Sequence, residues 1–275
     1  MSTPNNPLAS ILVLILSFCT CLVYGQEVLR GQVLSHADGQ PIPFANLSLT
    51  GTFFGTSANK NGEFVIKMED IPNADSLVVS AVGFGKKALP VKNILQQENV
   101  VIYLEEKTTL LGSVTVTKGK LKEKVIGKTK AGDNLGRMMG KNPGAQYGRK
   151  FVTHGKNMLI REVSTFVSCV PDSVTLRLRI YTFENNRQGE ELLNQNVFVE
   201  VGQTHGWVSV DLSSLEIWTD RDFIIGFEWL NNDFGYPMIG VGGMSSQTYF
   251  RLASHDDWKP ITNMNWAINA TVWVE

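Results

Sequence analysis

The stretch GQVLSHADGQPIPFANLSLTGT, residues 31–52, decides the fold of the first third of this chain. Apolar and polar residues alternate from 29 to 33, and a period of two residues indicates a half-buried β-strand. Asp38 and Gly39 then predict a tight turn, because glycine adopts a positive φ without steric cost. Phe44 opens a second alternating run, so the stretch predicts a strand, a turn and another strand.

Two further blocks repeat this pattern. NKNGEFVI, residues 59–66, places a turn before a strand, and LVVSAVGF, residues 77–84, is a strand that runs into a glycine. A last alternating run follows at 100–104. Several short strands separated by turns are typical of a β-sandwich, which we expect to span residues 26–116.

The order and spacing of these three blocks resemble the carboxypeptidase-regulatory-like (transthyretin-like) domain, which is common at the N-terminus of exported Bacteroidetes proteins. The resemblance implies an accessory β-sandwich, not the zinc-bearing catalytic domain of carboxypeptidases. The four histidines are scattered along the chain: His36, His154, His205 and His255. None stands in the H-x-x-E or H-E-x-x-H spacing that places two zinc ligands on one helix face. We therefore expect no metal, no cofactor and no enzymatic activity.

Residues 1–25 have the features of a signal peptide. The uninterrupted apolar run at 11–16 and its patchy continuation are too short for a membrane span, which needs about 20 apolar residues. Val23 and Gly25 supply the small side chains of a cleavage site before Gln26. Phe18, next to Cys19, stands where a lipobox has glycine or alanine, so we favour soluble export over a lipoprotein. We expect the mature chain in the periplasm or at the cell surface, associated with the outer membrane and without a transmembrane span.

A basic segment separates the two halves of the chain. The formal net charge is −1, yet residues 118–150 hold ten Lys/Arg and two acids, a net of 10 − 2 = +8. With its glycines, this composition predicts a flexible, solvated linker at 117–145. Two alternatives remain open: part of 114–126 forms an extra strand, or the segment binds an anionic polysaccharide. Because the chain is expected to be exported, we expect no nucleic-acid partner.

The second half, residues 146–275, also predicts strands. Apolar residues alternate at 174–180, 197–201 and 223–229, and about eight such runs indicate a jelly-roll-like sandwich. The runs at 177–181, 206–212 and 226–229 resemble the C-terminal half of small Bacteroidetes proteins with the same front domain, which implies architecture and export but no activity. Only Cys169 would remain after cleavage, so the fold must rest on its core and not on disulfides.

All six tryptophans lie in this second half. Trp229 and Trp266 share the parity of core residues and are predicted to be buried. Trp207 and Trp273 have the opposite parity, and Trp258 follows two aspartates, so these three are the candidate ligand-binding residues. The resulting prediction is an exported, non-catalytic binding or structural module at the bacterial cell envelope. The alternative is a glycan-binding accessory protein, and the expected partner is a cell-envelope protein or a polysaccharide.

Overall fold

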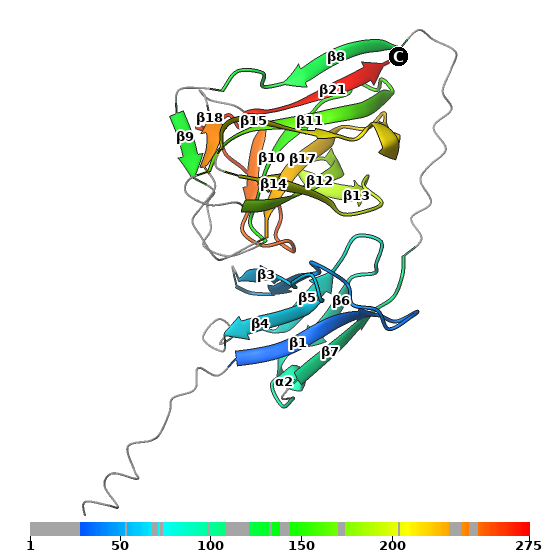
Figure 1. The fold of residues 1–275 in the computed structure, drawn as a ribbon, viewed down its shortest axis with the longest axis vertical. Coiled ribbons are helices and arrows are strands. Elements are labelled where there is room, and N and C mark those ends of the chain that lie inside the picture. The colour runs from blue at the N-terminus through cyan, green and yellow to red at the C-terminus, as the bar shows by residue number, and fades with distance from the viewer. Residues whose placement is uncertain are drawn as a thin grey trace, which may run out of the picture.

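The structure is a computed structural model. It describes the following residues: 28–52, 54–67, 71, 74–97, 99–107, 121–131, 134–137, 144–169, 174–202, 204–230, 238–241 and 247–275. The expected signal peptide, residues 1–25, lies outside them. The chain folds into two β-sandwiches (Figure 1), so the prediction of an all-β fold is confirmed. Within the described ranges, no helix is both long and apolar enough to cross a bilayer.

The first sandwich packs a three-stranded sheet on a four-stranded sheet. The three-stranded sheet has the order β4-β1-β7, with bounds β1 Val28–Ser35, β4 Glu63–Lys67 and β7 Asn99–Leu104. The four-stranded sheet has the order β3-β2-β5-β6, with bounds β2 Asn46–Leu49, β3 Gly55–Ser57, β5 Ser76–Ser80 and β6 Lys87–Pro90. One helical turn, α2 (Val91–Ile94), leads from β6 towards β7.

The turns of this sandwich follow the sequence predictions. Gly39 has a φ of 70°, which glycine tolerates without steric cost. In the second turn, the Asn59 side-chain oxygen accepts hydrogen bonds from the backbone N–H of Asn61 at 2.8 Å and of Glu63 at 3.0 Å, as an Asx-turn requires. Inward-facing residues such as Val33 and Ile66 then meet in one apolar core.

The second sandwich has two seven-stranded sheets. The first runs β13-β12-β17-β10-β19-β20, with β14 also paired to β12. Its strands are β10 Gln146–Phe151, β12 Val174–Glu184, β13 Arg187–Glu191, β14 Val197–Val201, β17 Phe223–Trp229, β19 Thr248–Arg251 and β20 Lys259–Pro260. We call this sheet the inner sheet, because it is the one that contacts the first sandwich.

The opposite sheet, here the outer sheet, runs β8-β21-β11-β18-β9, and β15 and β16 also pair with β11. Its strands are β8 Lys122–Gly127, β9 Asn134–Arg137, β11 Met158–Cys169, β15 Thr204–Asp211, β16 Ile217–Thr219, β18 Met238–Val241 and β21 Ile268–Val274. A short 3₁₀ turn, η2 (Ser213–Leu215), joins β15 to β16.

The prediction that residues 117–145 form a linker is wrong for two segments, β8 and β9. Strand β8 pairs antiparallel with the last strand β21, and β9 pairs with β18. Ile126 of β8 packs against the core of the second sandwich, while Lys122 and Lys124 stay exposed. Charged residues are common on such edge strands because they discourage pairing with another chain, so the charge that indicated a linker belongs here to a strand.

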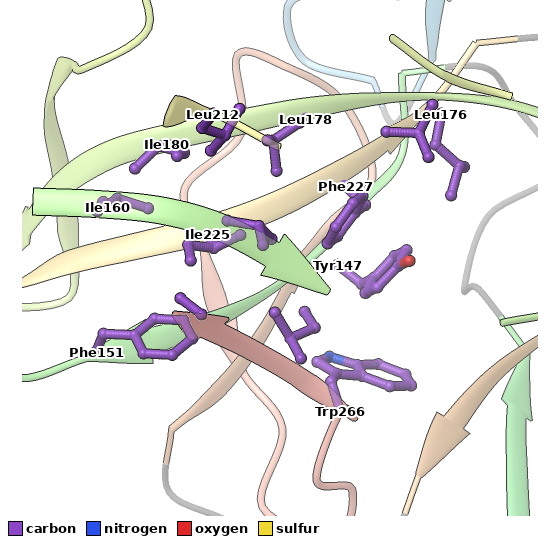
Figure 2. Close-up of a cluster of buried hydrophobic side chains, with 14 of the residues drawn as sticks. Tyr147, Phe151, Ile160, Leu176, Leu178, Ile180, Leu212, Ile225, Phe227 and Trp266 are labelled. Carbon is purple, nitrogen blue, oxygen red and sulfur yellow. The ribbon is translucent and has the colours of Figure 1, made fainter. Parts of the chain in front are cut away.

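The core of the second sandwich lies between its two sheets (Figure 2). The Tyr147 ring stacks on Phe227 with 5.5 Å between centroids and meets Trp266 edge-on at 5.7 Å. Trp266 is 1% exposed and Trp229 is 3% exposed, so the prediction that both are core residues is confirmed. The jelly-roll topology stays a prediction.

Arg177 of β12 ties the two sandwiches together. Its side chain is fully buried, and Nε donates to Glu228 Oε2 of β17 at 2.9 Å. Nη1 donates to the backbone oxygen of Phe44 at 2.6 Å, and Nη2 donates to Asn46 Oδ1, both in the first sandwich. The Phe44 ring also packs on Phe198, 4.6 Å between centroids. The contact between the sandwiches therefore combines hydrogen bonds from Arg177, whose charge is paired within the inner sheet, with an aromatic pair.

Candidate functional site

Trp207 lies on the solvent side of the outer sheet. Strand β15 alternates half-buried and exposed residues along its whole length, and Trp207 falls on the exposed parity. The indole is 37% exposed. The indole meets the Phe166 ring of the neighbouring β11 edge-on, with 5.8 Å between centroids. The His205 ring also meets the Phe166 ring edge-on, at 5.1 Å. These three rings form an aromatic cluster with one accessible indole.

Polar groups border this cluster along the same face. Ser209 and Ser164 face each other across β15 and β11, with 2.8 Å between their hydroxyl oxygens. Asp211 follows on β15 with an exposed carboxylate, and hydrogen bonds from Ser213 lower the pKa of that carboxyl. The charged carboxylate and the hydroxyls are acceptors and donors suited to hydroxyl groups of a ligand.

Trp273 lies on the same face, at the far end. In β21, Asn269, Thr271 and Trp273 share one parity, and Asn269 pairs with Ser164. The register of β11 against β21 shifts by one residue at a bulge between Ile160 and Glu162, so Thr271 pairs with Glu162 and Trp273 pairs with Leu159. Trp207 and Trp273 sit opposite β11 residues that are seven positions apart, Phe166 and Leu159, which corresponds to roughly 20 Å along a strand. The outer face therefore carries a tryptophan at each end of a polar row.

The Trp273 indole is partly engaged within the protein. Its Nε1–H donates to Glu123 Oε2 of β8 at 3.2 Å, and the Arg161 guanidinium lies 4.5 Å from the ring centroid. The ring is half-buried. Trp273 therefore offers less free surface than Trp207.

The prediction that Trp258 forms part of an exposed platform is wrong. Trp258 is 3% exposed and lies on the inner sheet, away from Trp207. Its ring covers two glycines that pair across β10 and β17, Gly148 and Gly226. A Cβ at Gly226 would stand 2.8 Å from the indole. The polar loop at 256–257 thus does not expose its tryptophan, because the two glycines leave a slot for the ring.

Trp258 belongs to a buried charged cluster that the sequence did not predict. Its indole Nε1–H donates to Gln188 at 3.1 Å, and the Arg251 guanidinium lies 4.6 Å from its ring centroid. Arg179 forms an ion pair with Glu191: Nη2 donates to Oε2 at 3.0 Å, and Nε, which donates to Tyr181 Oη at 2.7 Å, lies 2.8 Å from Oε1. Burial raises the pKa of Tyr181, so its phenol stays neutral.

A cleft of about 730 Å³ opens beside this cluster, between the two sandwiches. The second sandwich contributes Arg179, Tyr181, Gln188 and His255, and the first contributes the loop after β5 with Lys86. Its size is in the range of small-molecule sites, about 300–1,000 Å³. Among the described residues, no three or more His, Cys, Asp or Glu gather to hold a metal ion.

Residues 29–116 match the CarboxypepD_reg-like domain, and strands β1 to β7 of the first sandwich span residues 28–104. The match supports the resemblance carried by the three sequence blocks. The match covers residues 29–116. No curated protein matches the chain.

Several solved structures are similar to the chain at low identity. The cysteine protease and lectin-like domains of Cwp84, a surface layer associated protein of Clostridium difficile, have a TM-score of 0.40 and 9% identity. The alignment covers 84% of this chain and 58% of that one. A second structure of clostridial Cwp84, after propeptide cleavage, has a TM-score of 0.41 and 10% identity, over 84% and 66% of the two chains. The VP2 subviral particle of infectious bursal disease virus follows at 0.28 and 9%, over 90% and 63%. This chain spans less than two thirds of each of these structures.

Proposed function

We propose that the protein is a non-catalytic binding module of the bacterial cell envelope whose outer sheet binds a polysaccharide. The observation that carries the proposal is the exposed Trp207, set in an aromatic cluster at one end of a polar row. An accessible indole presents a flat apolar face to the C–H side of a sugar ring, and the neighbouring hydroxyls and Asp211 serve the sugar hydroxyls.

The geometry favours an extended ligand over a single sugar. One aromatic stack contributes on the order of 1 kcal/mol beyond area burial, so one sugar on Trp207 alone would bind weakly. A chain that also reaches Ser164, Ser209 and the partly engaged Trp273 gains several such contacts along roughly 20 Å of sheet. A linear polysaccharide fits this arrangement.

The other parts of the proposal rest on the sequence. The match of residues 29–116 to the CarboxypepD_reg-like domain and the scattered histidines support a non-catalytic role. The apolar run at 11–16 and the small residues before Gln26 support export to the periplasm or the cell surface. A cell-envelope protein as partner, instead of a polysaccharide, remains the second candidate for the same face.

The test is affinity electrophoresis of the purified chain in gels that contain envelope polysaccharides from the producing organism. Trp207→Ala should weaken retention about fivefold, because it removes about 1 kcal/mol of stacking. Tyr103→Ala is the matched control, since Tyr103 is an exposed aromatic of the first sandwich with 42% exposure. It should leave retention unchanged. Equal retention of the two variants would rule out the Trp207 face, and no retention of the parent protein would favour a protein partner.

A further inference from the structure

The two walls of the cleft between the sandwiches differ in their charged residues. The first sandwich supplies Lys86 and Lys107, with residues of the loop that follows β5. The second supplies Arg179 and, at the edge strand β13, Glu190 and Glu191. A site built from two domains is a common place for a ligand, so the balance of charge in the cleft decides which ligand fits.

The two carboxylates are already paired. Glu191 is held by Arg179 through both of its oxygens. Glu190 lies 3.1 Å from Nη2 of Arg221. Lys86 and Lys107 have no acidic partner among the described residues, and both are exposed. The cleft therefore carries positive charge that the protein itself does not neutralise.

Two buried nitrogen atoms in the cleft wall lack hydrogen-bond partners. One is Nη1 of Arg179, whose side chain is 7% exposed and whose nearest carboxylate oxygen, on Glu228, is 3.8 Å away. The other is Nδ1 of His255. Buried polar atoms nearly always have a partner, so an atom left without one at a cleft indicates a place for a ligand atom. Nη1 of Arg179 is a donor, whereas Nδ1 of His255 donates or accepts according to its tautomer.

The positive charges around the cleft also act on the pKa of His255. Burial lowers the pKa of His255, and the positive charges of Lys86 and Arg251 lower it further, against the opposing effect of Asp256. A larger hollow of about 920 Å³, lined by residues such as Arg30 and Val101, has no buried unpartnered polar atom in its described walls. The cleft is thus the better candidate for a specific ligand.

We propose that the cleft binds the anionic group, carboxylate or phosphate, of an acidic saccharide. Lys86 and Lys107 approach the anion from the first sandwich, and Nη1 of Arg179 donates to it from the second. Gln188 and Ser254, which also line the cleft, are placed to bond sugar hydroxyls. Charge-assisted hydrogen bonds of this kind are about twice as strong as neutral ones. The proposal concerns a second site, so it does not depend on the Trp207 face.

A ligand held from both sides would also stabilise the contact between the sandwiches. Anything that binds only the folded, docked arrangement shifts its stability by mass action. Binding should therefore raise the midpoint of thermal unfolding with ligand concentration. This effect gives a readout that is independent of the binding heat.

The test is isothermal titration of the full chain with glucuronate, glucose 6-phosphate and glucose at low ionic strength. Glucuronate or glucose 6-phosphate should bind, and glucose should bind more weakly than either. A preference between the two acids identifies the anion as carboxylate or phosphate. Lys86→Ala with Lys107→Ala should weaken binding at least about tenfold, since each lysine loses a charge-assisted contact.

Lys87→Ala is the matched control. Lys87 is the exposed neighbour of Lys86, but its ammonium donates to the backbone oxygen of Tyr103 at 2.9 Å and it does not line the cleft. Removing it should leave the affinity unchanged. The proposal is overturned if neither acid binds, if glucose binds as well as the acids, or if Lys87→Ala costs as much as the double variant. Because Trp207→Ala is assayed with polysaccharide on the other face, either proposal can fail alone.

Discussion

Replacing Arg177 by alanine should destabilise the protein more than any surface substitution. The wild-type guanidinium is fully buried and its pKa is lowered by that burial, yet Glu228 beside it stabilises the charged form. Truncation leaves the Glu228 carboxylate, also 0% exposed, with Arg179 Nη1 at 3.8 Å as its nearest cation. It also removes the donor to the Phe44 backbone oxygen.

The magnitude follows from these losses. Removing one partner of a buried ion pair costs about 3–5 kcal/mol, because the other charge stays buried without compensation. The released oxygen of Phe44 and the amide of Asn46 lose charge-assisted hydrogen bonds, which adds about 1–3 kcal/mol for a group left unsatisfied. Since domains are stable by about 5–15 kcal/mol, the change removes a large part of the total.

Urea unfolding followed by tryptophan fluorescence measures this loss. All six tryptophans belong to the second half of the chain, so the signal reports the second sandwich. Arg177→Met with Glu228→Leu should retain more stability than Arg177→Ala, because neither member of this pair is then left buried without its partner. Arg187→Ala, at an exposed site, should change stability by about 0.5 kcal/mol or less. A loss below about 1 kcal/mol for Arg177→Ala would refute the buried ion pair.

Two further predictions concern the inner sheet. Gly226→Ala should displace the Trp258 ring and cost about 1–3 kcal/mol by overpacking, since the new Cβ would stand 2.8 Å from the indole. Gly202→Ala, where no atom lies within 4 Å of the added Cβ, should be neutral, and urea unfolding compares the two. Burial lowers the pKa of His255 from 6.5 despite Asp256. The folded state therefore binds this proton less tightly than the unfolded state, and stability that is complete above pH 6.5 is lost as the pH falls through the folded pKa. His255→Gln should flatten the pH dependence of the unfolding midpoint in this window, and an unchanged slope would contradict it.

The features that the sequence predicts correctly depend on the pattern of residues along a single strand or turn. The turns at Gly39 and Asn59, the core positions of Trp229 and Trp266, and the outward parity of Trp207 and Trp273 all follow from a two-residue period and turn chemistry. These features need only the order of residues along one strand. The same strand pattern, however, does not say which strands are neighbours in a sheet.

The missed features depend on contacts between distant segments. Parity on β12 placed Arg177 and Arg179 opposite the apolar residues of the strand, but it could not show that the first sandwich covers that face. Trp258 is buried because Gly148 and Gly226 are in register on two different strands, and nothing local indicates that register. Two features of the sequence could have indicated these contacts. Arginines on β12 match in parity a glutamate on β17, and two predicted strands contain glycines.

Polysaccharide binding to the outer sheet is tested most directly by the six indole N–H resonances, recorded while an envelope polysaccharide is titrated into the full chain. The Trp207 signal should move most and the Trp273 signal should move with it, because both lie on the outer face. The signals of Trp229 and Trp266, which are 3% and 1% exposed, should stay in place. A polysaccharide that binds while the Trp207 signal remains fixed would contradict binding at the outer sheet.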